Sequence, residues 1–172
     1  CGFDWIQYHS TVEHDYLTHG FWAISKEEEL PCPGISAVML KSMEDVTERV
    51  LEGVTKETSN DERAEIVTAN IKKIKEEAEA NSDYQVIIKS FYHGNKYYMI
   101  YNEVFKDVRM VGAPPSNIGK FGGDTDNWVW PRHTGDFSVF RIYVSPDGKA
   151  ADYSEDNVPY TPNYHFPISL KG

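Results

Sequence analysis

The chain has 172 residues, of which 40% are apolar and 26% are charged, which is typical of one globular domain and too short for two full-sized ones. Its 17 basic and 27 acidic residues give a net charge of −10, which repels nucleic-acid phosphates and anionic lipid surfaces. The longest apolar stretches, such as residues 35–40, are far shorter than the roughly 20 residues of a membrane span. We therefore expect no nucleic-acid partner and no membrane span.

The first 40 residues combine aromatic-rich segments with breaks at proline and glycine. Residues 3–8, 21–24 and 35–40 read as strands, and Pro31-Cys32-Pro33-Gly34 separates the last of them from the rest. Cys1 and Cys32 allow a disulfide, a shared metal site or two free thiols, and their number favours none of these. Because the first residue is Cys and no leader precedes it, we expect a processed chain or a piece of a longer one.

Residues 43–81 change in character and predict a helical insertion. The segment has no proline and one glycine, and glutamate and lysine dominate it. Ser59 and Glu62 have the spacing of a capping box at a helix start. Apolar residues then follow at helical spacing, so one stripe faces a core and the charges face solvent; the stripe consists of Val67, Ile71, Ile74 and Ala78.

Strand signals return after residue 84. Residues 85–91 and 97–105, with a His93–Lys96 turn between them, predict a β-hairpin. Residues 112–130 are too rich in glycine and proline for regular structure, and a loop this long in a compact domain usually has a task.

The last third of the chain completes the predicted fold class. Residues 136–144 read as a strand, 145–148 as a turn and 159–172 as extended chain. Strands, a helical segment and further strands, in this order, predict a mainly β fold with antiparallel strands and a helical insertion at about 43–81, rather than alternating βαβ units.

Two motifs that suggest a bound ligand do not meet its requirements. Ile118-Gly119-Lys120-Phe121 resembles the end of a phosphate-binding loop, but Phe121 replaces the required Ser or Thr and Pro114 replaces the first Gly. His9, His14 and His19 lie five residues apart, whereas zinc ligands on a helix recur at three or four. We therefore expect surface histidines, with no metal and no cofactor.

The segment Gly122–Ser138 is the strongest candidate for a site, because it holds two tryptophans, an arginine, a histidine and several acids. Asp136 precedes a predicted strand, where a carboxylate can be buried while its oxygens stay hydrogen-bonded. Such a buried, ionised Asp orients the imidazole of a Ser-His-Asp triad. Asp136 is equally suited to capping a turn, and the residues alone leave both readings open.

The remaining candidates concern the nucleophile. No serine lies in a Gly-x-Ser-x-Gly or Gly-Asp-Ser-Gly context, so a serine hydrolase would need a nucleophile outside this chain. Cys1 at a true amino terminus could act as the nucleophile of an amidohydrolase, with its own α-amine as base. A lipid-attached Cys1 on a non-enzymatic envelope binding module is the other alternative.

Four motifs resemble the bacterial dipeptidyl-peptidase 7 and dipeptidyl-peptidase 11 family of serine exopeptidases, serine peptidase family 46. The resemblance extends over nearly the whole chain, and its longest motif is also its most specific. The motifs are residues 13–23, 27–31, 120–138 and 156–160.

This resemblance implies a chymotrypsin-like double β-barrel peptidase domain, of which residues 1–172 are a fragment with a helical insertion at about 43–81. It implies an enzyme of the bacterial periplasm or cell envelope that releases dipeptides from free amino termini of peptides, and it allows a homodimer. The family pattern places the catalytic His just before Cys1 and the Ser far beyond residue 172. With two triad members outside it, the chain alone is expected to be inactive.

The same resemblance assigns the site residues. Asp136 matches the Asp of the Ser-His-Asp triad. Asn127, with Trp128 beside it, matches the residues that hold the substrate's α-ammonium group. Cys32 departs from the pattern, since a small polar residue is expected there, and this argues against a family-wide disulfide to Cys1.

Overall fold

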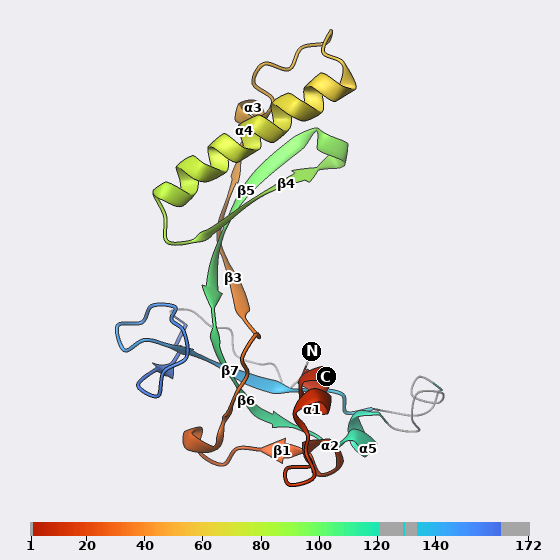
Figure 1. The fold of residues 1–172 in the computed structure, drawn as a ribbon, viewed down its shortest axis with the longest axis vertical. Helices are drawn as coiled ribbons and strands as arrows, with labels where there is room; N and C mark the ends of the chain where they lie inside the picture. The colour runs from red at the N-terminus through yellow and green to blue at the C-terminus, as the bar shows by residue number, and fades with distance from the viewer. Residues whose placement is uncertain (1, 121–128, 130–133, 163–172) are drawn as a thin grey trace, which may run out of the picture. The chain divides into compact units, whose positions relative to one another are not determined.

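The computed structural model describes residues 2–120, 129 and 134–162, with side chains from Trp5 onward (Figure 1). The chain divides into two compact units, Cys1–Ala37 with Phe105–Gly172 and Val38–Val104. Each unit has its own antiparallel strand pairs and its own hydrophobic core. The prediction of a mainly β fold with a helical segment is confirmed, while the assignment of residues 1–172 to one peptidase domain stays a prediction.

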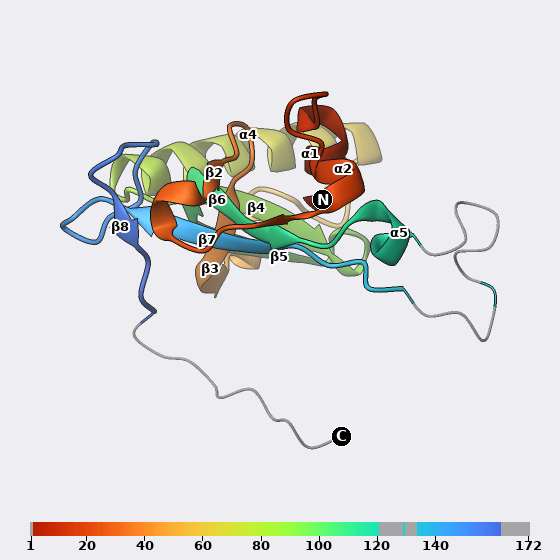
Figure 2. The same cartoon turned by 90° about the horizontal axis from the view of Figure 1, so that it is seen from below.

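The first unit is built on a sheet whose central strand is β6. The strand order is β1-β6-β7-β8, and β2 also pairs with β6. Figure 2 shows β2, β6 and β7 side by side in this sheet. The strands are β1 (Phe21–Trp22), β2 (Leu30–Pro31), β6 (Asp107–Ala113), β7 (Val139–Val144) and β8 (Val158–Pro159).

The helices α1 and α2 pack against this sheet. Trp5 and Ile6 of α1 pack with Met110 and Ala113 of β6 and with Cys32 in the core of the unit. The helices are α1 (Gly2–His9), α2 (Tyr16–His19) and α5 (Ser116–Gly119), with a 3-10 turn η1 (Lys26–Glu28).

The prediction of a strand at residues 3–8 is wrong, because this segment is helix α1. Its aromatic content favours a strand. Trp5 and Ile6 are neighbours and both are buried, however, whereas a strand would point neighbouring side chains to opposite faces. A helix lets both side chains reach the same sheet.

The second unit combines one long helix with a three-stranded sheet of order β3-β5-β4. Ile74 of α4 packs against Val86 of β4 and against Tyr97 and Met99 of β5, and the predicted stripe residues Val67, Ile71 and Ala78 lie around this core. The elements are β3 (Ala37–Asp45), α3 (Thr47–Val50), α4 (Asn60–Ala80), β4 (Gln85–Phe91), a 3-10 turn η2 (Tyr92–Gly94) and β5 (Lys96–Phe105).

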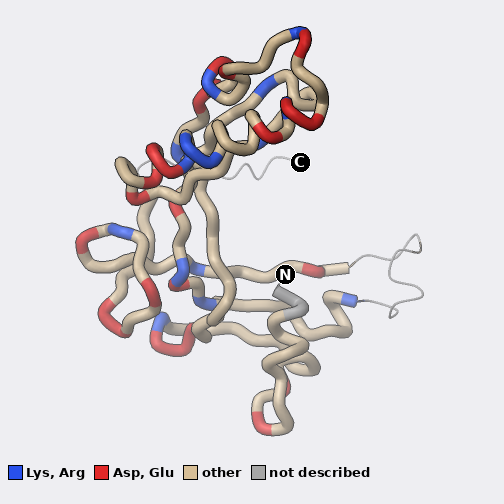
Figure 3. Tube along the Cα trace, turned by 45° about the horizontal axis from the view of Figure 1, so that its top comes forward, with Lys and Arg blue, Asp and Glu red and all other residues tan. Residues whose placement is uncertain are grey.

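Helix α4 begins as the sequence predicts. The Ser59 hydroxyl accepts a hydrogen bond from the Glu62 amide at 3.3 Å, and the Glu62 carboxylate accepts one from the Ser59 amide at 3.0 Å. Both acidic and basic residues lie along this helix (Figure 3), and Lys75 and Glu79 form an ion pair of 3.5 Å. The helical segment starts at Thr47 rather than at 43, because β3 continues through Asp45.

The hairpin of β4 and β5 is confirmed, with Ile88 opposite Met99. Its turn is unusual because Tyr92, His93 and Gly94 all have positive φ, of 51°, 55° and 82°. The Arg63 guanidinium of α4 donates a hydrogen bond of 2.8 Å to the Gly94 carbonyl and thereby holds the turn against the helix.

Candidate functional site

Asp136 is the predicted site residue that the structure describes, and it lies at a sharp turn just before β7. The Phe137 amide donates a hydrogen bond of 3.1 Å to the Gly135 carbonyl, which makes Asp136 the central residue of a three-residue γ-turn. The predicted strand therefore begins at Val139 rather than at Asp136.

Two contacts of Gly135 fix this turn to helix α5. The Gly135 amide donates a hydrogen bond of 3.0 Å to the Ile118 carbonyl. A Cβ at position 135 would lie 2.9 Å from the Ile118 Cγ2, closer than carbon atoms approach in proteins. A larger residue at position 135 would therefore force the Ile118 side chain to shift.

The other side of the turn is held by aromatic rings. The Phe137 ring contacts the Trp22 ring of β1, with centroids 6.1 Å apart and planes inclined at 51°. Trp22 pairs with Gly112 of β6, and a Cβ at Gly112 would lie 2.4 Å from the indole. The indole therefore lies directly over the Gly112 backbone.

A continuous series of contacts joins this site to the start of the chain. Helix α1 contacts α2, and α2 contacts α5, which carries the Ile118 carbonyl that binds Gly135. Figure 2 shows α1 and α2 together at one end of β6, with α5 beyond them. The turn that carries Asp136 is thus connected, through α5 and α2, to the amino-terminal helix α1.

The expected burial of Asp136 is not found in the described part of the chain. Its side chain is exposed, and within residues 2–120, 129 and 134–162 no group donates a hydrogen bond to its carboxylate. The physical reason is that the sheet begins three residues later, at Val139, so the turn projects beyond the sheet's last strand pair.

Asn127 and Trp128, the other predicted site residues, lie outside the described residues, as does Cys1. Cys32 is a buried free thiol whose Sγ lies 3.3 Å from the Leu30 carbonyl oxygen. His9, His14 and His19 are exposed as predicted; His9 stacks on Trp5 and His14 on Tyr16. Within the described residues no three metal-binding side chains come together, and no helix is long and apolar enough to cross a membrane.

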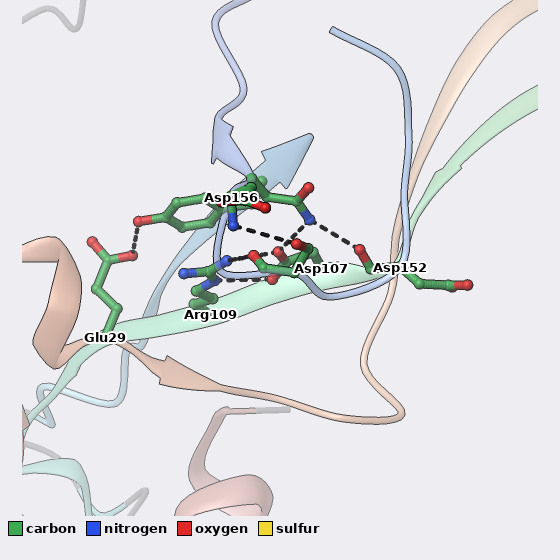
Figure 4. Close-up of polar contacts among 8 residues, drawn as sticks. Glu29, Asp107, Arg109, Asp152 and Asp156 are labelled. Carbon is green, nitrogen blue, oxygen red and sulfur yellow. Dashed lines mark hydrogen bonds and ion pairs between the residues drawn. The ribbon is translucent and has the colours of Figure 1, made fainter. Parts of the chain in front are cut away.

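The structure also contains a buried polar network that the sequence did not reveal (Figure 4). Asp107 and Arg109, two residues apart on β6, form a two-pronged ion pair with distances of 3.0 and 2.8 Å. The Asn157 amide donates to Asp107 at 2.8 Å, and Arg109 donates to the Ser154 carbonyl at 2.9 Å. The network therefore fastens the segment before β8 to the sheet.

Burial on its own would raise the pKa of the Asp107 carboxyl, but the hydrogen bonds from Arg109 and Asn157 outweigh it and hold that pKa below its usual value. The guanidinium of Arg109 also stacks on the Tyr143 ring, 3.8 Å from its centroid. Because its charges are paired with one another, this network is suited to holding loops rather than to exchanging protons.

A second buried carboxylate belongs to the same face of the sheet. Glu29 accepts hydrogen bonds from Arg141 at 2.7 Å and from the Tyr143 hydroxyl at 2.8 Å. Burial, together with the bond to Glu29, raises the pKa of Tyr143 to about 12. The spacing Asp107-x-Arg109 was the one sequence signal of the polar network, since alternate residues of a strand share a face. The other members of the network come from segments distant in sequence.

Comparison with known proteins identifies the family. The model of the peptidase S46 family matches residues 1–172. This chain belongs to the peptidase S46 family. It is 52% identical over 172 residues to an Asp/Glu-specific dipeptidyl-peptidase of Capnocytophaga gingivalis and 50% identical over 175 residues to dipeptidyl-peptidase 7 of Porphyromonas gingivalis. Each alignment covers 100% of this chain and 24% of the relative, so this S46 chain spans about a quarter of the length of these relatives.

Solved structures agree with this assignment. The S46 chain superposes on Porphyromonas endodontalis DPP11 with a TM-score of 0.82 at 44% identity, covering 25% of that chain. It superposes on the same enzyme in complex with the dipeptide Arg-Glu with a TM-score of 0.79 at 46% identity. The mainly β architecture and these matches are consistent with a fragment of a double β-barrel.

Proposed function

We propose that this S46 chain is part of a serine dipeptidyl-peptidase that releases dipeptides from the free amino termini of peptides. The observation that carries the proposal is the family match over residues 1–172, together with relatives near 50% identity that are named dipeptidyl-peptidases. A nucleophilic serine and a histidine from outside these residues would complete the active site.

Asp136 is the proposed orienting carboxylate of the Ser-His-Asp triad. Such a carboxylate holds the imidazole in the tautomer that can take the serine proton, and it stabilises the imidazolium that forms. The carboxylate is exposed on a turn anchored at Gly135 and Phe137, so an imidazole from outside the described residues has access to it. Docking of that imidazole segment would remove Asp136 from water.

Asn127 and Trp128 are proposed to bind the amino terminus of the substrate. The side-chain carbonyl of an asparagine can accept a hydrogen bond from an α-ammonium group, and an aromatic ring beside it can cover the adjacent residue. The net charge of −10 favours the approach of a cationic amino terminus. The crystal structure of Porphyromonas endodontalis DPP11 in complex with the dipeptide Arg-Glu supports a dipeptide-sized ligand for the family.

We also propose the wider setting that the family resemblance implies. The sheet would contribute to a chymotrypsin-like double β-barrel, and the enzyme would act in the periplasm or cell envelope of a bacterium, with a homodimer as its assembled form. The antiparallel pairing of β1, β6, β7 and β8 is compatible with a barrel wall.

The substitution Asn127→Ala in the full-length protein tests the proposed function. Loss of the amide should weaken binding of peptides with free amino termini by at least about 1 kcal/mol, a rise in KM of about fivefold or more. The measurement is steady-state release of dipeptides, detected by mass spectrometry, from a peptide with a free amino terminus.

The matched substrate control is the same peptide with an acetylated amino terminus. The wild-type protein should release no dipeptide from it. Equal cleavage of free and acetylated peptides by the wild type would refute the exopeptidase assignment, and an unchanged KM in Asn127→Ala would refute the role of Asn127.

A further inference from the structure

Two aromatic side chains beside the proposed catalytic turn remain largely in water. Trp22 is 56% exposed and Phe137 is 49% exposed, although both are large enough to be strong core-forming residues. They contact each other, with centroids 6.1 Å apart, within the range in which aromatic pairs attract. The pair therefore contributes a local contact at this turn rather than burial in the core of the unit.

The structure places the indole of Trp22 against the central strand of the sheet. The indole rests on Gly112, where any side chain would collide with it, and Gly112 pairs with both Trp22 of β1 and Val139 of β7. The ring of Trp22 thus lies across the central strand toward the strand that Phe137 precedes. A rigid sheet supports the indole, and the indole supports the Phe137 ring.

Asp136 is held from both sides by neighbours in the chain. On one side Gly135 is bonded to the Ile118 carbonyl, and on the other side Phe137 is held by the indole. If the ring contact were lost, only two hydrogen bonds described here would restrain the backbone at Asp136: the bond from Gly135 to Ile118 and the 3.1 Å bond from Phe137 to Gly135. Phe137 is therefore the point at which the sheet can control the direction of the Asp136 side chain.

We infer that Trp22 is a positioning residue that acts through Phe137 to orient the carboxylate of Asp136. The inference rests on the proposed function, since it gives Asp136 the task of holding an imidazole. A carboxylate that is not held in one orientation no longer keeps the imidazole in the required tautomer. A displacement of about 1 Å at a catalytic group can cost about 100-fold in rate.

The first test is Trp22→Ala in the full-length protein, assayed with a dipeptidyl substrate. We expect kcat to fall about 10- to 100-fold, with KM changed by less than about twofold, because the contacts of Trp22 described above are with Gly112 and Phe137. Trp22→Phe keeps an aromatic ring over Gly112 and should recover most of the lost kcat. A rise in KM with unchanged kcat, or no recovery of kcat in Trp22→Phe, would overturn the inference.

The matched control is Tyr8→Ala, which removes another exposed aromatic residue, 83% exposed, of the same unit. It should leave kcat within about twofold of the wild type. A second variant, Phe137→Leu, removes the ring pair while keeping an apolar side chain, and it should reproduce the kcat loss of Trp22→Ala without a greater loss of thermal stability than the control. If Phe137→Leu has wild-type kcat, the proposed route through Phe137 is wrong.

A double-mutant cycle separates this inference from the proposed function. If Trp22 acts through Asp136, then Trp22→Ala should cause less than a twofold further loss of kcat when Asp136→Asn is already present. A full additional loss in that background would overturn the positioning role while leaving the triad role of Asp136 intact. An Asp136→Asn protein with wild-type kcat would instead overturn the proposed triad role of Asp136, and the inference with it.

Discussion

Cys32 shows how a single residue's environment decides its chemistry. Burial raises the pKa of its thiol to about 11, with an opposing backbone hydrogen bond too weak to compensate. Since the thiolate is the reactive form, about one molecule in a thousand is reactive at pH 8. The thiol in the folded protein is therefore expected to be inert.

We predict that iodoacetamide at pH 8 labels Cys32 at least about tenfold more slowly in the native full-length protein than in denaturant, where the pKa returns to about 8.5. Peptide mass spectrometry measures the label. Rapid labelling of the native protein would contradict the buried position. Labelling of the denatured protein only after reduction would contradict the free thiol and indicate a disulfide.

Asp107 gives a prediction about stability. Asp107→Asn leaves the buried Arg109 without its counter-charge, and removal of one partner from a buried ion pair costs about 3–5 kcal/mol. Because the pKa of Asp107 is held below its usual value, this stabilisation is complete above about pH 4, the ordinary Asp value, and declines as pH falls through the lowered pKa.

Hydrogen exchange of the β6 and β7 amides in the full-length protein measures this cost at pH 7 and its decline at about pH 3, below the ordinary Asp value. The control is Asp152→Asn, whose side chain forms only a mostly exposed pair with Lys106 and whose backbone carbonyl still accepts from Asn157. It should change local stability by less than about 0.5 kcal/mol. Equal effects of the two substitutions would contradict the buried network.

At the scale of elements, helix α4 offers the clearest test of local sequence signals. Ser59→Ala removes the acceptor for the Glu62 amide, and loss of such a cap costs about 1 kcal/mol. We predict that amides in the first turn, at residues 61–63, exchange about fivefold faster with solvent. Ser59→Asp retains an acceptor and should restore the wild-type rate; failure to restore it would show that the capping box does not stabilise the helix.

Elements with complete local signals could be predicted from the sequence. Their patterns depend on neighbours within a few residues and can therefore be recognised in the sequence. These elements are the capping box at Ser59, the stripe through Ile74 and the hairpin of residues 85–105. Helix α1 was missed because its aromatic residues favour a strand, and only its packing on β6 decides the outcome. The polar network was missed because Asp107 meets Asn157 across 50 residues.

At the scale of the whole molecule, the family pattern carried more information than the physical pattern around the site. The aspartate was singled out by its position before a strand, yet the strand begins at Val139 and Asp136 is exposed. The rings that hold its turn, Trp22 and Phe137, are 115 positions apart in the sequence, so no local motif could connect them. The chain spans about a quarter of the length of its relatives, so the proposed triad would need residues from outside this chain.

The central claim is that Asp136 orients the catalytic histidine of a serine dipeptidyl-peptidase. The most direct measurement is kcat of Asp136→Asn in the full-length protein with a dipeptidyl substrate bearing a free amino terminus. The amide keeps the shape of the side chain but favours the wrong imidazole tautomer, so kcat should fall about 10⁴-fold while substrate binding is retained. A kcat equal to that of the wild type would contradict the claim.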